Sequence, residues 1–296
     1  MSKVRTFISL LKTPTKLVQP LGRYGLLNWI PDETYVKLLY KAEFGKNPNL
    51  KEPKSFNEKI QWLKLHDRNP IYSEYVDKIT AKEKIGEIIG TEYIVPLLNQ
   101  WERVDEIDFS SLPCKCVLKC NHDQGSTIIY ESGKTDPDEV KKHFSKCLKR
   151  NPYRETREWP YKNVVPKIMC EPFLAEDIID YKLFCFNGKA RIINIGQKGN
   201  IDHITRVTFL DMNWEQLPFQ RSDYERIRKL PERPKQLDSL VKLAETIAKD
   251  TRFVRVDFFV VDEKVYFSEY TLFPTTGLIH FLPQEGDIVI GEYIEL

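Results

Sequence analysis

Residues 1–70 carry apolar positions at helical spacing, whereas the rest of the chain consists mainly of short β-rich runs separated by turn residues. Residues 34–40 have the spacing of an amphipathic helix. Ser55 and Glu58 fit a capping box, in which each side chain bonds the other residue's backbone N–H, at the start of a further helix. The apolar positions over 71–89 predict one more helix before the strands begin.

Strands dominate the remaining sequence, and the Asn187-Gly188 pair between two of them is typical of a two-residue hairpin turn. Helices are expected after an Asp136 N-cap with Pro137 as the first helical residue, and over 237–249. Antiparallel hairpins interrupted by helices predict an α+β fold. A parallel nucleotide-binding sheet is not expected, because the glycine-rich motifs G-x-x-x-x-G-K-[ST] and G-x-G-x-x-G are both absent. The predicted strands are 93–98, 115–121, 127–130, 166–171, 181–186, 189–195 and 206–210.

A hairpin near the C-terminus brings two acidic side chains together. With Glu263 at the centre of the turn, Asp257 lies opposite Glu269, and alternation places Arg255 and Thr271 on the same face. Directly opposed carboxylates destabilise a sheet by about 0.2–1 kcal/mol, and a cation that joins them reverses the sign. Two carboxylates with phosphate oxygens and water suit Mg²⁺. An ion pair of Arg255 with either acid is the alternative.

Composition narrows the class of protein. The chain has 296 residues, enough for one large domain or two to three small ones, and its net charge of +2 gives no general attraction to nucleic acid. No apolar run approaches the ~18–20 residues of a membrane span. The six cysteines fit neither zinc-pair spacing nor a secreted disulfide framework, so we expect reduced thiols in a cytoplasmic protein.

The charge is unevenly placed, because several basic residues and no acid precede Asp32. Interleaved with apolar residues, they favour either a basic face that rests on anionic lipid or a partner, or a solvated arm. Peripheral contact with the inner face of the membrane is therefore one expectation. The basic residues are Lys3, Arg5, Lys12, Lys16 and Arg23.

Two strand lysines are candidates for phosphate binding. Lys119 lies near the end of an apolar strand before the loop 122–126, and Lys182 lies on the Asn-Gly hairpin. A lysine that emerges from buried surface needs a counter-charge, which either a phosphate or a protein carboxylate supplies. Glu171 ends a strand, where it can accept from sugar hydroxyls or serve as an ordinary surface acid. Arg206 is a candidate phosphate clamp.

Asp77-Lys78 precedes these elements, and in their order along the chain they resemble the ATP-grasp superfamily. More narrowly, they resemble the TupA-like ATP-grasp proteins of bacterial surface-polysaccharide gene clusters. The resemblance runs from about residue 34 to the end. The segments that carry it are Ser55–Leu63, Leu118–His122, Glu158–Asn163, Asp180–Lys189 and Phe253–Asp257.

The resemblance implies ATP and Mg²⁺ held between two α+β subdomains whose antiparallel sheets clasp the nucleotide. It implies a helical N-terminal region over 1–70, a first subdomain over 71–170, and a second with the metal site over 171–296. By position, the implied phosphate-binding residues are Lys119, Lys182, Gly125 and Ser126, and those for ribose and adenine are Glu171, Phe173 and Leu174. The implied metal ligands are Asp257 and Glu269, and the residues that neutralise the transferred phosphoryl group are Arg255 and Arg206.

The implied activity is that of an ATP-dependent carboxylate–amine ligase in bacterial surface polysaccharide biosynthesis. A sugar-acid (uronic acid) carboxylate would form an acyl phosphate, which an amine such as an amino acid would convert into an amide. The alternatives are a kinase on a sugar hydroxyl, a sugar-nucleotide-dependent glycosyltransferase and a non-catalytic nucleotide-binding scaffold. The chain departs from the family pattern in its loop, where Asp123-Gln124 replaces a glycine-richer segment, and at Thr271, where many relatives have asparagine.

Overall fold

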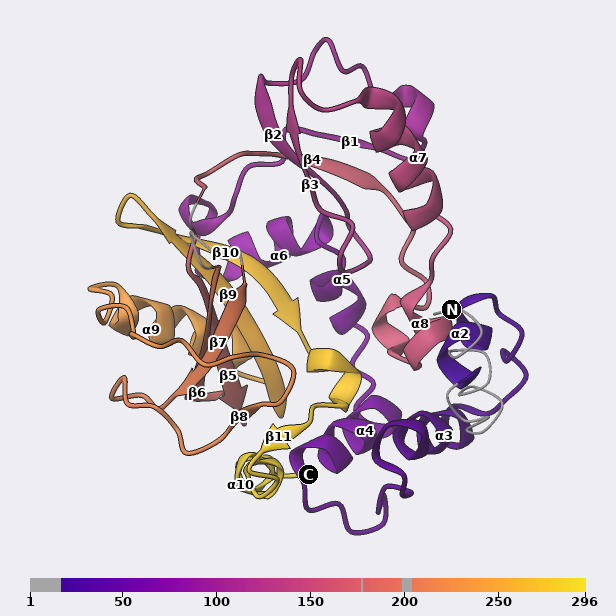
Figure 1. Cartoon of the computed structure of the whole chain (residues 1–296), viewed down its shortest axis with the longest axis vertical. Coiled ribbons are helices and arrows are strands. Elements are labelled where there is room, and N and C mark those ends of the chain that lie inside the picture. Colours follow the sequence, from indigo (N-terminus) through magenta and orange to yellow (C-terminus); the bar gives the residue numbers. More distant parts are fainter. Residues whose placement is uncertain (1–16, 177, 199–203) are drawn as a thin grey trace.

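Two antiparallel sheets frame the molecule in its computed structural model, which describes residues 17–176, 178–198 and 204–296. The smaller sheet has the strand order β1-β4-β2-β3 and the larger one β10-β9-β5-β6-β7; Figure 1 shows them in the upper and left-hand parts of the view. Strands β8 and β11 form a separate two-stranded ribbon. The strands are β1 (Asn99–Trp101), β2 (Lys115–Cys120), β3 (Ile128–Glu131), β4 (Ile168–Pro172), β5 (Asp180–Phe186), β6 (Lys189–Lys198), β7 (Thr205–Leu210), β8 (Gln220–Arg221), β9 (Phe253–Val261), β10 (Lys264–Thr271) and β11 (Phe281–Leu282).

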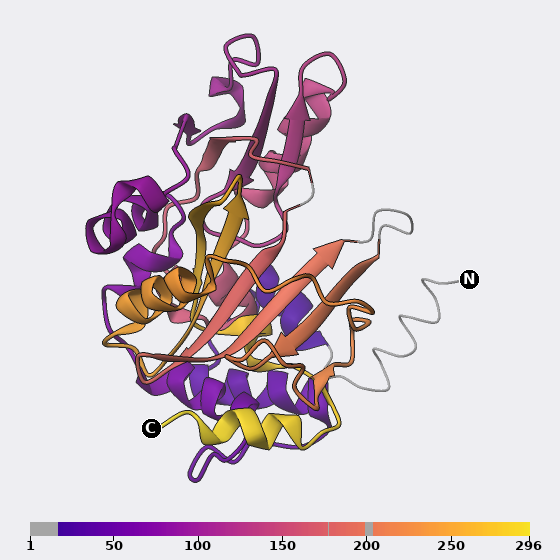
Figure 2. The same cartoon turned by 90° about the vertical axis from the view of Figure 1, so that its left-hand side faces the viewer.

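Helices cover the outer sides of this frame. Helix α9 packs against β5, β6 and β9 of the larger sheet, and α4 packs against α10 below that sheet in Figure 2. The helices are α2 (Val18–Arg23), α3 (Asp32–Phe44), α4 (Phe56–His66), α5 (Tyr72–Val76), α6 (Thr80–Ile89), α7 (Pro137–Cys147), α8 (Pro152–Thr156), α9 (Leu237–Ala248) and α10 (Gly286–Glu292). Short 3₁₀ turns are η2 (Thr91–Tyr93), η3 (Val104–Glu106), η4 (Trp159–Tyr161) and η5 (Pro274–Gly277).

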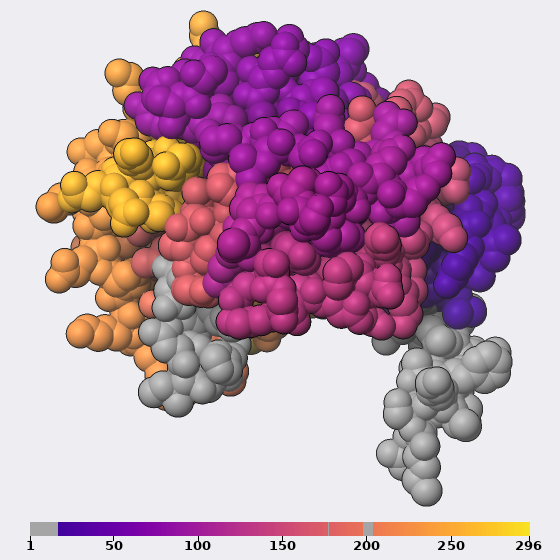
Figure 3. All heavy atoms as spheres, turned by 90° about the horizontal axis from the view of Figure 1, so that it is seen from above, coloured from indigo at the N-terminus to yellow at the C-terminus, as the bar shows by residue number. Residues whose placement is uncertain are grey.

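Each sheet has a hydrophobic core of its own. The larger core joins the five-stranded sheet to α4, α5, α6, α9 and α10, with Phe56 and Val254 fully buried. The smaller core joins β2 and β4 to α7 through Leu118 and Phe144. Full burial of one such side chain stabilises the fold by about 1.5–3 kcal/mol. The segment that carries β2, β3 and α7 forms much of the face seen from above in Figure 3.

The predicted start and turn signals are confirmed. Ser55 and Glu58 form the capping box of α4, and the Asp136 side chain accepts from Asp138 N at 2.9 Å at the start of α7. Asn187 and Gly188 join β5 to β6 with φ values of 49° and 76°, as a hairpin turn with two positive φ angles requires.

The pairing of Asp257 with Glu269 is also confirmed, although the turn differs from the one predicted. Lys264 pairs with Val261, so the loop has two residues, and a bulge between Phe267 and Glu269 shifts the register by one. The extra residue of the bulge restores the pairing that a turn centred on Glu263 would have given.

Two predicted elements are wrong. The helix predicted over 71–89 is broken between α5 and α6, because Asp77 is extended (ψ 110°) and its carboxylate accepts from Ile79 N at 2.9 Å. The strand predicted over 93–98 is reduced to a single bridge at Ile94, and β1 begins only at Asn99. Pro96 lies inside that segment and has no N–H for a ladder.

The basic N-terminal segment lies mostly outside the described residues. Arg23 is described, and its Nε lies 2.9 Å from Glu155 Oε1. Among the residues that the structure describes, no helix is long and apolar enough to cross a membrane.

Candidate active site

A cavity of about 680 Å³ lies between the two sheets, and side chains of both line it. Its volume is within the range of small-molecule sites. Two of the residues predicted for the site, Ser126 and Arg206, are not among those that line it. The predicted residues that do line it are Lys119, Gly125, Glu171, Phe173, Leu174, Lys182, Arg255, Asp257 and Glu269.

At one end of the cavity, Arg255 contacts both acids of the C-terminal hairpin. Its guanidinium donates to the two oxygens of Asp257 at 2.7 and 2.6 Å and lies 3.5 Å from Glu269 Oε2. It also donates to Thr271 Oγ1 at 3.1 Å. Burial lowers the pKa of Arg255, but Asp257 and Glu269 outweigh burial and raise this pKa above its ordinary value. The ion pair that the sequence left as an alternative is therefore present, with one arginine shared by two carboxylates.

Two lysines complete this charged cluster. Lys182 Nζ lies 3.4 Å from Asp257 Oδ2 and also pairs with Asp180. Lys78 Nζ lies 3.2 Å from Glu269 Oε1 and donates to the backbone oxygen of Asp123 at 2.7 Å. Burial raises the pKa of Glu269, but Lys78 and Arg255 outweigh it and lower this pKa to about 2.

Lys78 was missed as a site residue. In a continuous helix the backbone N–H of Lys78 would bond within the helix. Because the helix breaks after α5, this N–H instead donates to Asn121 O at 3.0 Å. This bond ties Lys78 to the loop that follows β2. The only signal in the sequence was the Asp77-Lys78 pair within the order of elements that resembled ATP-grasp proteins.

The donor set of Asp257 and Glu269 fits a magnesium ion. The two residues are direct cross-strand partners, and both line the cavity. A carboxylate offers about four lone-pair positions, so the two hydrogen bonds from Arg255 leave Asp257 with acceptor capacity. Mg²⁺ is commonly held by one or two carboxylates together with phosphate oxygens. Lys78 and Arg255 lower the pKa of Glu269 and so favour its charged form, which metal binding requires.

Glu171, also on the cavity wall, is held between two lysines. Lys119 Nζ lies 2.7 Å from one carboxylate oxygen, and Lys82 Nζ lies 2.6 Å from the other. Burial raises the pKa of Glu171, but these two ammonium groups outweigh it and lower this pKa. Phe173 follows on the cavity wall, where Lys115 Nζ lies 4.0 Å from the centre of its ring. The protein counter-ion left open for Lys119 is thus Glu171.

Buried hydrogen bonds hold the loop after β2 in place. Ser126 Oγ donates to Asp123 Oδ1 at 2.5 Å and accepts from Cys120 N at 2.8 Å, so it fixes the loop and lies outside the cavity wall. The Asp123 side chain is fully buried, and Arg150 Nη1 lies 3.4 Å from its second oxygen. The added carboxylate of this loop therefore faces its own arginine. Gly125 lines the cavity with φ +82°, a conformation that favours glycine.

Behind the loop, Cys120, Asp123 and Cys147 each have one potential ligand atom within 4.8 Å of the others. Burial raises the pKa of both thiols, which disfavours the thiolates that a metal ion needs. All six cysteines are free.

Arg206 is placed away from the cluster. It lies on β7 at the edge of the larger sheet, and its Nη2 is 3.1 Å from Glu225 Oε2. The sequence pattern contained no information on how far β7 lies from the C-terminal hairpin.

Comparison with known proteins places the chain in a family. A model of the family described as TupA-like ATPgrasp matches residues 58–295, and the chain belongs to that family. The membership confirms the resemblance and the ATP-grasp-like α+β fold. ATP-grasp proteins are ATP-dependent carboxylate–amine ligases that use Mg²⁺, which agrees with the predicted class of enzyme and its cofactors. A search of curated proteins gave no match.

Solved structures with similarity to the chain include ATP-grasp enzymes. The D-alanine–D-alanine ligase from Bacillus anthracis complexed with ATP is 19% identical over 67% of this chain and 55% of that chain, with a TM-score of 0.40. The Helicobacter pylori D-alanine–D-alanine ligase is 14% identical over 82% and 70%, with a TM-score of 0.44. An ADP complex of the purK N5-carboxyaminoimidazole ribonucleotide synthetase is 14% identical over 73% and 50%, with a TM-score of 0.42. The chain thus spans about half the length of the first of these enzymes.

Proposed function

We propose that the protein is an ATP-dependent ligase that joins the carboxylate of a sugar acid to an amine through an acyl phosphate. One observation carries the proposal: an arginine, lysines from both sheets and two directly paired carboxylates converge on one cavity of about 680 Å³. Membership in the TupA-like ATP-grasp family supports it. The carboxylate donor as a uronic acid, the amine as an amino acid, and a role in bacterial surface polysaccharide synthesis are further parts of the proposal.

In this proposal the nucleotide lies along the cavity. Glu171, Phe173 and Leu174 contact the ribose and adenine, and Lys119 and Lys182 contact the phosphates. Glu171 carries one negative charge between the two ammonium groups of Lys119 and Lys82, so a phosphate beside Lys119 offsets the remaining positive charge. Burial lowers the pKa of Lys182, and a phosphate beside its ammonium group would oppose that effect.

Asp257 and Glu269 are the proposed holders of Mg²⁺, which when bound neutralises phosphate charge and orients the phosphoryl group. Arg255 lies between these two acids and presents a fixed positive charge to the same end of the cavity. Its guanidinium is held by Asp257 and Thr271, so it needs no reorganisation when negative charge develops on the phosphoryl group.

The overall reaction balances as RCO₂⁻ + R′NH₃⁺ + ATP⁴⁻ → RCONHR′ + ADP³⁻ + HPO₄²⁻ + H⁺. A carboxylate oxygen attacks the γ-phosphorus, and the bond from that phosphorus to the bridging oxygen of ADP breaks. The uncharged amine then attacks the acyl carbon, and the bond from this carbon to the phosphate oxygen breaks. Inorganic phosphate leaves with the electron pair, and the nitrogen loses its remaining excess proton to solvent.

A phosphate-release screen tests the proposal. ATP and Mg²⁺ are combined with uronic acids and amino acids, and Asp257→Ala and Glu269→Ala are assayed beside the parent. The parent should release phosphate in at least one pairing, and both variants should lose that activity. Added hydroxylamine should trap a hydroxamate. A phosphorylated sugar that survives hydroxylamine would instead identify a kinase.

The compartment is part of the same proposal. Six free thiols and ATP as a substrate suit the cytoplasm, and contact with the inner face of the membrane through the basic N-terminal segment would bring the enzyme to a lipid-linked substrate.

A further inference from the structure

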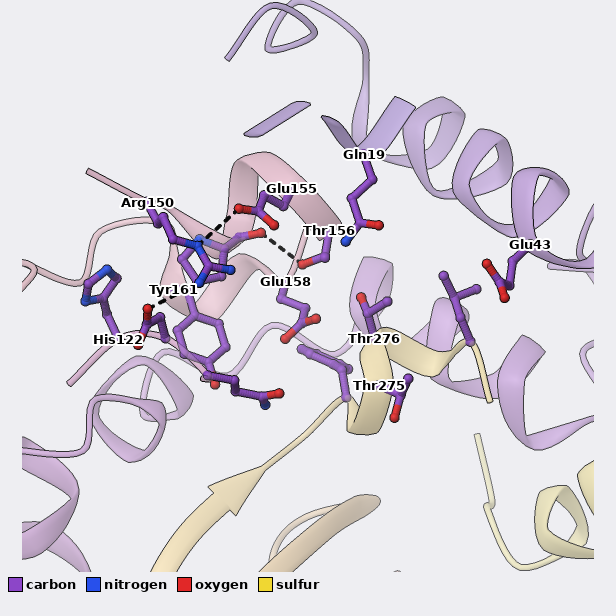
Figure 4. A pocket seen from close by; sticks show the side chains of 15 residues that line it. Gln19, Glu43, His122, Arg150, Glu155, Thr156, Glu158, Tyr161, Thr275 and Thr276 are labelled. Carbon is purple, nitrogen blue, oxygen red and sulfur yellow. Dashed lines mark hydrogen bonds and ion pairs between the residues drawn. The ribbon is translucent and has the colours of Figure 1, made fainter. Parts of the chain in front are cut away.

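A second cavity, of about 340 Å³, adjoins the nucleotide cavity. Both are lined by Asp123, Gln124 and Thr275, so they are neighbouring compartments of one site. The second cavity lies between α8 and η4 on one side and η5 on the other, as Figure 4 shows. Its wall includes Glu158 and Tyr161 of a segment that carried the family resemblance but has no role in the nucleotide site.

Three of the carboxylates that line this cavity already have cationic or titratable partners. Glu155 lies 2.9 Å from Arg23 Nε and 3.5 Å from Arg150 Nε. Arg150 also contacts Asp123, and the Glu43 carboxylate at the rim accepts from His280 Nε2 at 2.8 Å. Arg150 is therefore shared by two carboxylates, which balance its charge.

Glu158 is different, because it forms no ion pair with any residue of the described chain. In Figure 4 its carboxyl group points into the cavity, between Tyr161 and Thr276. Burial raises the pKa of this carboxyl group, and Lys64 with the hydroxyls of Thr276 and Thr156 opposes the rise. Lys64 Nζ is itself occupied, since it donates to Gln61 Oε1 at 2.9 Å and to Thr276 O at 2.9 Å.

Tyr161 links this carboxyl group to the charged end of the nucleotide cavity. Burial raises the pKa of its hydroxyl, the carboxylates of Glu269 and Glu158 raise it further, and Arg255 opposes them. The hydroxyl is thus within electrostatic reach of Glu158 on one side and of the proposed metal and phosphoryl residues on the other. Since Asp123, Gln124 and Thr275 line both cavities, a group held by Glu158 would lie beside the nucleotide cavity.

We propose that this second cavity is the amine-acceptor subsite and that the carboxylate of Glu158 binds the ammonium group of the acceptor. The inference rests on the proposed ligase function. A partly buried carboxylate without a cation is costly, and an ammonium group beside it removes that cost. The wall of this cavity holds four acids and one arginine, so an anionic donor is disfavoured here and the sugar acid approaches from the nucleotide side. An amino acid is the class of acceptor that we assign.

The test separates acyl-phosphate formation from use of the amine. Hydroxylamine is largely uncharged at neutral pH and needs no ammonium site. Glu158→Gln should therefore keep the hydroxamate rate of the parent, while its KM for the amino acid rises about tenfold to a hundredfold. Glu232→Gln, the same change at an exposed glutamate that lines neither cavity, should match the parent in both assays. Equal KM values in Glu158→Gln and the parent would overturn the proposal.

A binding measurement covers the case in which no uronic acid yields hydroxamate, which would count against the proposed function itself. The protein loaded with Mg²⁺ and ADP is dialysed to equilibrium against the twenty amino acids, and the retained amino acids are quantified. The parent and Glu232→Gln should retain at least one amino acid that Glu158→Gln does not. If the parent retains no amino acid, or if Glu158→Gln retains as much as the parent, the proposed acceptor subsite is overturned.

Discussion

Replacing Glu269 by glutamine should make the free energy of unfolding fall less steeply as the pH is lowered below 4.5. Lys78 and Arg255 lower the pKa of this carboxyl group from its ordinary 4.5 to about 2 in the folded protein. The unfolded chain therefore binds the proton more readily than the folded one. The stability contributed by Glu269 is fully present above pH 4.5 and is lost as the pH falls toward 2.

The size of the effect follows from the shift. A difference of roughly 2.5 pKa units between the unfolded and the folded protein corresponds to about 3 kcal/mol of folding free energy. All of it is lost once Glu269 is protonated in both states. At pH 3 the unfolded chain is almost fully protonated at this position and the folded protein is not, so about 2 kcal/mol of that contribution is already lost.

Urea unfolding at pH 7 and at pH 3 measures this contribution. The fall in the free energy of unfolding between the two pH values should be smaller in Glu269→Gln than in the parent by about 2 kcal/mol. Glu263→Gln provides the control, because Glu263 lies in the exposed turn of the same hairpin, 3.6 Å from Lys235. Identical falls in Glu269→Gln and the parent would refute the assignment of strong pairing at Glu269.

Three further outcomes are expected. Lys182→Met should weaken ATP binding about tenfold or more in a calorimetric titration, whereas the exposed Lys189→Met should leave the Kd unchanged. Arg150→Met should also weaken ATP binding, because it leaves the Asp123 carboxylate uncompensated beside the phosphates. The additional change Asp123→Asn should restore the affinity for ATP, and failure of that rescue would contradict the pairing of Arg150 with Asp123. Gly277→Ala should lower the free energy of unfolding by about 1–3 kcal/mol, since φ is +70° and the new Cβ would lie 2.5 Å from Ile60 and Gln61 side-chain atoms; an unchanged urea midpoint would contradict this.

Local signals in the sequence were sufficient to predict the pairing of the two acids in the site. The partners Asp257 and Glu269 lie within one hairpin, where turn length and alternation fix which residues face each other. The prediction succeeded through two compensating differences, a shorter turn and a bulge. Capping at Ser55 and the turn at Asn187 were predictable for the same reason, because the residues involved are neighbours in the chain.

Features that depend on distant segments were not predictable. Lys78 reaches Glu269 only because the helix breaks at Asp77 and docks on the loop after β2. Apolar periodicity continues through the break and gives no sign of it. Arg206 is an arginine on a strand of the same sheet, but the distance from β7 to β9 depends on strand order, which alternation does not encode.

The effect of the loop after β2 also depends on a residue elsewhere in the chain. The sequence identified Asp123 as an added carboxylate near phosphate. Whether it repels the nucleotide depends on Arg150, which lies beyond the end of α7 and neutralises it. The second cavity likewise assembles from α8 and η4, which are neighbours in the chain, and from the distant η5, and that contact was not visible in the sequence.

The account depends most on a magnesium-bound nucleotide held against Asp257 and Glu269. Calorimetric titration of the parent with ATP, in Mg²⁺ and in excess EDTA, tests this directly when it is repeated with Asp257→Asn. We predict that Mg²⁺ strengthens ATP binding to the parent and that this dependence disappears in the variant. The same Mg²⁺ dependence in both proteins, or no binding of ATP to the parent, would contradict the account.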